Sequence, residues 1–136
     1  MKLLNEHEVR YLLVGGFAVS YHGYPRTTAD IDLWIDVEAQ NAARVLNVVN
    51  EFGLTSPDLT TATFLIPDQI FRMGFPPLRI ELLTGISGVE FEECYTSRIQ
   101  GEIDDITVAI INLTHLKANK KASGRFKDLN DLENLP

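Results

Sequence analysis

Two aspartates, Asp30 and Asp32, are separated by one residue in a stretch where polar and apolar side chains alternate. On a β-strand, residues two apart point to the same side and lie about 6–7 Å apart. Carboxylates held that close repel each other unless a cation lies between them. Magnesium prefers oxygen ligands, so this spacing fits a site for Mg²⁺ that binds a triphosphate. The same spacing also fits a solvated strand face whose acids are incidental.

Two consecutive glycines, Gly15 and Gly16, follow a short apolar run and precede a helical pattern. Glycine lets the backbone approach a ligand closely, and a helix N-terminus offers free N–H groups that suit a phosphate. The pattern therefore predicts either a phosphate-binding turn or a tight turn that only packing requires.

A third carboxylate, Glu81, interrupts an apolar stretch that has the alternation of a strand. Alternation puts Glu81 on the face opposite Ile80 and Leu82. If this strand neighbours the one with Asp30 and Asp32, the three acids can converge. The alternative is a surface glutamate paired with Arg79 or another cation.

Positive charge is concentrated near the C-terminal end. Residues 117–127 contain five Lys or Arg and no acid. A lysine from a late helix can reach a triphosphate and offset its negative charge. A solvated helix face is the other interpretation of such a run.

The elements that must position these residues follow from periodicity and from glycine and proline breaks. We expect helices at residues 2–8, 17–22, 39–52, 89–95, 113–122 and 128–135, and strands at 11–14, 30–36, 70–73, 78–83 and 106–111. Residues 56–68 are ambiguous and fit two short helices, and residues 74–77 join two strands. This order predicts an α/β (α+β) fold with helices packed on one mixed sheet.

Composition limits the choice of protein class. The chain has 136 residues, which predicts a single domain over residues 1–136. Its 45% hydrophobic and 23% charged residues are ordinary for a soluble globular protein. No apolar run approaches the roughly 20 residues of a membrane span, and residues 1–10 lack a signal-peptide pattern. With Cys94 as its one cysteine, the chain is expected to be cytoplasmic.

Taken together, these residues resemble the nucleotidyltransferase superfamily with the polymerase-beta-type fold, in particular its minimal bacterial and archaeal branch. The resemblance covers nearly the whole chain. It rests on Leu13-Val14-Gly15-Gly16-Phe17-Ala18, on Arg26-Thr27-Thr28-Ala29-Asp30-Ile31-Asp32-Leu33, on Pro76-Pro77-Leu78-Arg79-Ile80-Glu81-Leu82-Leu83-Thr84, and on Lys120-Lys121-Ala122-Ser123-Gly124-Arg125-Phe126-Lys127-Asp128. The chain is also similar to nucleotidyltransferase toxins of abortive-infection systems.

The resemblance implies a nucleotidyltransferase-type mixed sheet and a set of roles. Asp30, Asp32 and Glu81 would be catalytic and bind Mg²⁺, with Glu81 helping to deprotonate the acceptor hydroxyl. Residues expected to bind the nucleotide are Gly15, Gly16, Arg26, Lys120 and, as an alternative to Lys120, Lys121. Arg26, Arg125 and Asp128 would also support the site through ion pairs. Two positions depart from the family's frequent residues: Gly16 stands where serine is common, and Glu81 where aspartate is common.

The leading hypothesis is a Mg²⁺-dependent enzyme that moves a nucleotidyl group from an NTP such as ATP to a hydroxyl of a protein, RNA or small molecule and releases pyrophosphate. The alternative is a non-catalytic module of a toxin–antitoxin pair that forms a homodimer or binds a partner toxin. An exposed apolar patch with Phe71, Phe75 and Phe91 would favour this alternative. A third hypothesis, a nucleic-acid binder using residues 117–127, has to overcome a net charge of −7.

Overall fold

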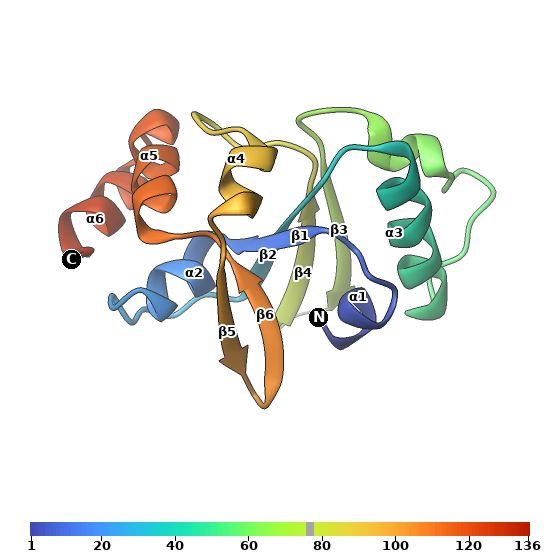
Figure 1. Ribbon diagram of the computed structural model, residues 1–136, viewed down its shortest axis with the longest axis horizontal. Coiled ribbons are helices and arrows are strands. Elements are labelled where there is room, and N and C mark those ends of the chain that lie inside the picture. Colours follow the sequence, from blue (N-terminus) through green and yellow to red (C-terminus); the bar gives the residue numbers. More distant parts are fainter. Residues whose placement is uncertain (76–77) are drawn as a thin grey trace.

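The chain folds as a six-stranded mixed sheet with helices on both sides (Figure 1). The computed structural model describes residues 1–75 and 78–136, apart from the side chains of Phe75 and Leu78. In chain order the elements are α1 (Lys2–Glu6), β1 (Tyr11–Val14), α2 (Gly15–Tyr21), β2 (Asp30–Ile35), α3 (Ala39–Glu51), the 3₁₀ helix η1 (Thr61–Leu65), β3 (Ile70–Phe75), β4 (Leu78–Leu83), α4 (Phe91–Thr96), β5 (Ile99–Ile103), β6 (Ile106–Ile110), α5 (Leu113–Ser123) and α6 (Phe126–Asn134).

The strand order is β3-β4-β2-β1-β6-β5. Strand β1 pairs antiparallel with β2 and parallel with β6, and β2 pairs parallel with β4. All four residues of β1 are buried, as expected for a short apolar strand in the middle of a sheet. The predicted α/β class, with helices packed on one mixed sheet, is therefore confirmed.

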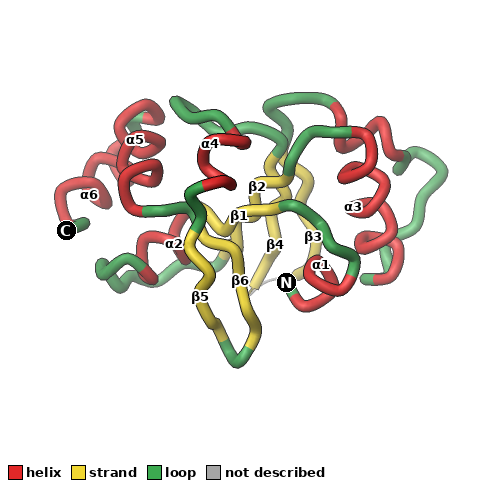
Figure 2. The backbone as a smooth tube through the Cα atoms, viewed as in Figure 1, coloured by secondary structure: helices red, strands yellow, loops and turns green. Residues whose placement is uncertain are grey.

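Helices cover the sheet in two groups. Figures 1 and 2 show α2, α5 and α6 together on one side and α1 and α3 on the other. In β2, Leu33 and Ile35 are fully buried on one face, and Trp34 is buried on the other, whereas Asp30 and Asp32 on the face of Trp34 remain partly accessible. The end of this face that carries the aspartates is thus left open beside α5 and α6.

The ends of α5 are fixed by local sequence. The Asn112 side chain accepts a hydrogen bond from the His115 amide at 2.8 Å, which caps the first turn. At the other end Gly124 adopts a left-handed conformation with φ 67° and stops the helix. The chain then turns directly into α6, so both helices stand beside the open face of β2.

Several element predictions differ from the structure. Strand β5 is missing from the sequence prediction because Ile99–Ile103 is short and contains Gly101 and two polar residues. Its hairpin with β6 turns through Asp104 and Asp105, both at positive φ, as a two-residue primed turn requires.

Other differences are shifts of boundaries. Helix α2 begins at Gly15 and α6 at Phe126, two residues before the predicted starts in each case, and the ambiguous segment 56–68 holds one 3₁₀ helix rather than two helices. The predicted connection through Pro76 and Pro77 lies outside the described residues. Within the described part of the chain, no helix combines the length and hydrophobicity needed to cross a bilayer.

Candidate active site

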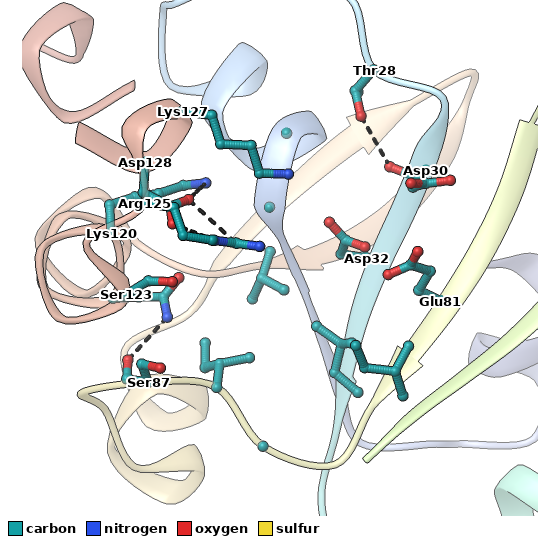
Figure 3. A pocket seen from close by; sticks show the side chains of 18 of the residues that line it. Thr28, Asp30, Asp32, Glu81, Ser87, Lys120, Ser123, Arg125, Lys127 and Asp128 are labelled. Atoms are coloured by element: carbon teal, nitrogen blue, oxygen red, sulfur yellow. Dashed lines mark hydrogen bonds and ion pairs between the residues drawn. The ribbon is translucent and has the colours of Figure 1, made fainter. Parts of the chain in front are cut away.

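The open face of the sheet forms the floor of a cleft of about 790 Å³. Three carboxylates lie on this floor: Asp30 and Asp32 from β2 and Glu81 from β4 (Figure 3). In the parallel register of the two strands Asp32 is directly opposite Glu81, so both side chains point to the same face. We call these three residues the carboxylate floor. Strands β2 and β4 are thus neighbours, which is the condition for the three acids to share one face.

Asp32 is the electrostatically strained member of the floor. Burial, the negative charge of Glu81 and a hydrogen bond with that carboxyl group raise the pKa of Asp32 to about 7, and Asp30 adds to the effect. Lys127 acts in the opposite direction and lowers the pKa. Two adjacent acids that cannot both ionise at low cost are typical of a site that is completed by a cation.

The other two carboxylates have arginine partners. Arg79 Nε lies 3.1 Å from Asp30 Oδ1, and Arg72 Nε lies 3.2 Å from Glu81 Oε1. The sequence alternative for Glu81, an ion pair with a cation, is thus present, and the cation is Arg72 rather than Arg79. Among the ion pairs of the described residues, none involves Asp32.

The donor set fits a divalent cation at two of the three carboxylates. Asp32 and Glu81 are directly opposite each other on β2 and β4, and a cation between them would remove their mutual repulsion. Asp30 shares their face, but its carboxylate is held by Arg79. Accordingly, residues 1–75 and 78–136 contain no ready-made group of three or more His, Cys, Asp or Glu side chains that could hold a metal. The predicted three-ligand site is therefore not preformed, because Arg79 competes for Asp30.

The glycine turn lies directly against Asp32. Gly15 has φ +67°, and a Cβ placed on it would lie 2.0 Å from Asp32 Oδ2. A Cβ on Gly16 would lie 3.0 Å from Thr28 Oγ1. No side chain caps the first turn of α2, which begins at Gly15. The backbone at this point is bare because any side chain on Gly15 would collide with the carboxylate floor.

Cations line the opposite side of the cleft, on α5 and at the start of α6. Arg125 and Lys127 are exposed and extend toward Asp32 and Glu81 (Figure 3). The pKa of Arg125 is raised, first by its hydrogen bond to Asp128 and also by the charges of Asp128 and Asp32. We call Lys120, Arg125 and Lys127 the cationic wall.

Lys120 differs from the other two members of the wall because it is buried, with an exposed fraction of 4%. Its ammonium lies 3.1 Å from Asp128 Oδ1 and 3.1 Å from Asp131 Oδ2. Asp131 also accepts two hydrogen bonds from Arg26, at 2.7 and 2.8 Å. Asp128 accepts one from Arg125 Nε at 2.7 Å. These five charged residues form one network around the buried Lys120, Asp128 and Asp131, and we call it the buried network; it ties α6 to α5 and to the segment before β2.

Four of the five predicted nucleotide-binding residues line the cleft, and one does not. Gly15, Gly16, Arg26 and Lys120 all line the cleft, although Arg26 and Lys120 are already engaged by buried aspartates. Lys121 is exposed and does not line the cleft. Lys127, which sequence reasoning did not single out, does line it. The only sequence signal for Lys127 is its position in the basic run beside the start of α6.

Two of the three aromatic residues that would have favoured a non-catalytic module pack against the core. Phe71 packs edge-on against Phe64, with ring centroids 5.5 Å apart. Phe91 packs against Trp34 at 5.1 Å and stacks on Tyr95 at 5.3 Å. Both are half-buried, and the Phe75 side chain lies outside the described residues. Phe71 and Phe91 thus do not form the exposed patch on which that alternative depends.

Comparison with known proteins identifies the fold. No protein-family model matches the chain, and no curated protein sequence does. Among solved structures, the chain is similar to a protein from Thermotoga maritima that is provisionally described as a nucleotidyltransferase. The TM-score is 0.65 at 15% sequence identity, over 97% of this chain and 84% of that one. The predicted nucleotidyltransferase-type fold is therefore confirmed.

Proposed function

We propose that this chain is a Mg²⁺-dependent nucleotidyltransferase. A hydroxyl of the acceptor attacks the α-phosphorus of a nucleoside triphosphate, a new phosphorus–oxygen bond forms, and the bond to the leaving pyrophosphate breaks. The observation that carries this proposal is the Asp32 carboxylate, which has no ion-pair partner among the described residues, lies between Glu81 and the bare Gly15 turn, and faces exposed cations across the cleft. Phosphoryl chemistry depends mainly on positioning and on charge stabilisation, which these residues can provide.

The carboxylate floor has the role of holding a divalent ion and accepting a proton. Asp32 and Glu81 would hold Mg²⁺, and Asp30 would join them only by giving up part of its pairing with Arg79. When bound, the ion offsets the negative charge of the phosphates. Glu81, aligned by Arg72, receives the proton of the acceptor hydroxyl.

The glycine turn and the cationic wall have the role of holding the triphosphate. Gly15 and Gly16 line the cleft with bare backbone at the uncapped start of α2, where N–H groups suit a phosphate. Arg125 and Lys127 neutralise the phosphates from the opposite side. Lys120 acts indirectly. Its ammonium donates a hydrogen bond to Asp128, and Asp128 in turn holds the guanidinium of Arg125.

Transfer of label from α-³²P-NTPs tests this function. The purified chain is incubated with Mg²⁺, each NTP in turn and candidate protein, RNA and small-molecule acceptors. We expect Asp32→Asn and Glu81→Gln to reduce labelling by at least about 100-fold. Asp105→Asn, at the exposed tip of the β5–β6 hairpin, is the matched control and should leave labelling unchanged. Absence of labelling with every NTP and acceptor, or full labelling by Asp32→Asn, would contradict the proposal.

A further inference from the structure

The carboxylate floor is followed along the strands by an apolar surface that also lines the cleft. Two residues after Glu81, on the same face of β4, lies Leu83, and Ile70 of β3 is directly opposite it. Leu83 is half-buried, whereas Ile70 is 51% exposed, the third most exposed of the large apolar side chains described. Apolar side chains on the floor of a polar cleft suit a ligand that has an apolar face.

A short loop forms the wall beside this apolar surface. Residues 85–87 follow β4 and line the cleft. The loop is fixed to α5, because Asn119 Nδ2 donates a hydrogen bond to the Ser87 carbonyl at 2.9 Å. A Cβ on Gly88 would lie 2.4 Å from the Ala122 Cβ, so the loop also packs tightly against that helix. We call Ile70, Leu83 and residues 85–87 the neutral end of the cleft.

A carboxylate, that of Asp68, lies at the far side of the neutral end. The Gln69 amide donates a hydrogen bond to Thr84 Oγ1 and the Thr84 amide donates one to the Gln69 carbonyl, so Asp68 is next to Gly85. A Cβ on Gly85 would lie 2.1 Å from Asp68 Oδ1, which means that glycine leaves room for the carboxylate. Asp68 lines the cleft, and none of the ion pairs among the described residues involves it.

The geometry of the proposed transfer decides where the nucleoside lies. The attacking oxygen and the leaving pyrophosphate are in line, on opposite sides of the α-phosphorus. Because Glu81 accepts the proton and Gly15 binds the phosphates, the line of attack runs across the strands, from β4 over β2 to the end of β1. Figure 3 shows Arg125 and Glu81 on opposite sides of the cleft, in agreement with this direction. The nucleoside leaves the α-phosphorus at an angle to that line and therefore extends along the strands.

The two directions along the strands differ in charge. Toward the start of β2 and β4 lies the ion pair of Asp30 and Arg79, whose atoms Oδ1 and Nε are 3.1 Å apart. Toward the ends of these strands lies the neutral end. Figure 3 shows Thr28 on the first side and Ser87 on the second. A ribose and its base are uncharged and the base has apolar faces, so the second direction fits a nucleoside.

We propose that the neutral end is the subsite for the nucleobase and that Asp68 makes it selective for guanine. This inference rests on the proposed function and names its nucleotide. Residues two apart on a strand are about 6–7 Å apart, so Asp68 lies roughly 13 Å from Glu81, at the second such step. A base that lies on Leu83 and Ile70 turns its outer edge toward Asp68.

The chemistry of a carboxylate selects among the four bases. An ionised carboxylate only accepts hydrogen bonds. Guanine presents two neighbouring donors on its outer edge, the N1–H and the 2-amino group, and matches both oxygens of Asp68. Adenine and cytosine present one amino group beside a ring nitrogen that accepts, and uracil presents one N–H between two carbonyl oxygens. Guanine is therefore the base that gives Asp68 two hydrogen bonds and no repulsive contact.

Calorimetric titration with the α,β-methylene analogues of GTP, ATP, CTP and UTP in Mg²⁺ tests the subsite. We expect the guanine analogue to bind about 5- to 150-fold more tightly than the adenine analogue, the usual range for one bidentate contact to a base. The hypoxanthine analogue, which lacks the 2-amino group, should bind with intermediate affinity.

Asp68→Asn is the critical variant, because an amide both accepts and donates a hydrogen bond and so matches adenine. It should reverse the preference from guanine to adenine, a result that a general loss of structure cannot produce. Asparagine also tolerates the left-handed backbone of this position, where φ is 56°. Asp105→Asn is the matched control and should keep the guanine preference.

The outcomes separate this inference from the proposed function. Equal binding of the four analogues, a preference for another base, or a guanine preference that Asp68→Asn retains would overturn the subsite and leave the proposed function intact. Failure of the unmodified chain to bind any analogue would contradict the proposed function, and the subsite with it.

Discussion

The two sides of the cleft differ in how their charged side chains are paired. On the carboxylate floor, like charges are adjacent and Asp32 has no ion-pair partner among the described residues, so the pKa of Asp32 rises to about 7. On the side of the cationic wall, opposite charges are paired: Lys120 is held by Asp128 and Asp131, Asp128 also binds Arg125, and Asp131 also binds Arg26.

This difference distinguishes charged residues that stabilise the fold from charged residues that are available to bind a ligand. Charges that satisfy one another stabilise the fold and hold elements in place, whereas a charge left uncompensated costs stability and is available to a ligand. Removing a charge from the buried network should therefore destabilise the protein, and removing one from the floor should stabilise it.

The largest effect is expected for Lys120→Met. It leaves two buried carboxylates short of a partner and should lower the free energy of unfolding by about 3–5 kcal/mol, as measured by urea unfolding. Lys121→Met is the matched control on the exposed side of the same helix and should change stability by less than about 0.5 kcal/mol. Equal effects of the two substitutions would show that Lys120 is not structural.

Gly15→Ala comes next, with an expected loss of about 2–4 kcal/mol in the free energy of unfolding. About 1 kcal/mol comes from the positive φ and the remainder from the overlap with Asp32. Gly124→Ala separates these causes, because Gly124 has the same φ of +67° but its added Cβ would meet nothing closer than 3.8 Å. Urea unfolding should show a clearly smaller loss for Gly124→Ala; the reverse order would contradict the close approach of Gly15 to Asp32.

Acid should weaken the buried network. Burial alone would raise the pKa of Asp128, but hydrogen bonds from Arg125, Lys120 and Ser123 lower it to about 2. The stability that follows is present above about pH 4, where the carboxyl group of the unfolded chain is ionised, and is lost as the pH falls through 2. It amounts to about 2 kcal/mol.

Urea titrations from pH 5 down to pH 2 measure this loss. Asp128→Asn should be less stable than the unmodified chain at pH 5, and the gap should close toward pH 2. A gap that stays constant over this range would mean that the pKa of Asp128 is not lowered.

The smallest expected effect is an increase in the free energy of unfolding. Asp32→Asn removes one of two like charges that face each other across β2 and β4 and should raise the free energy of unfolding by roughly 0.5–1 kcal/mol at pH 8 without metal. Asp105→Asn should leave stability unchanged. Destabilisation by Asp32→Asn would place Asp32 in the same class as the buried aspartates and remove the contrast between floor and network.

The sequence predicted the floor better than the network for a physical reason. Alternation in β2 and β4 dictates which residues share a face, so the common side of Asp30, Asp32 and Glu81 followed once the strands were neighbours. The pairing of Arg79 with Asp30 and of Arg72 with Glu81 depends on cross-strand register, which short strands do not specify.

Residues of the helices were harder to predict. A run of lysines gives no indication of which one points inward, and the burial of Lys120 is decided by Asp128 and Asp131 on the following helix. Lys127 was missed for the same reason: it lines the cleft from the first turn of α6, which begins at Phe126, two residues earlier than predicted.

Calorimetric titration of a non-hydrolysable NTP analogue tests the central claim most directly. The titration is made in Mg²⁺ and again in EDTA, with the unmodified chain and with Asp32→Asn. We expect binding by the unmodified chain in Mg²⁺ and binding at least about tenfold weaker in EDTA or with Asp32→Asn. Equal affinity in all four titrations, or no binding of any NTP analogue, would contradict the assignment of this cleft to a metal-bound nucleotide.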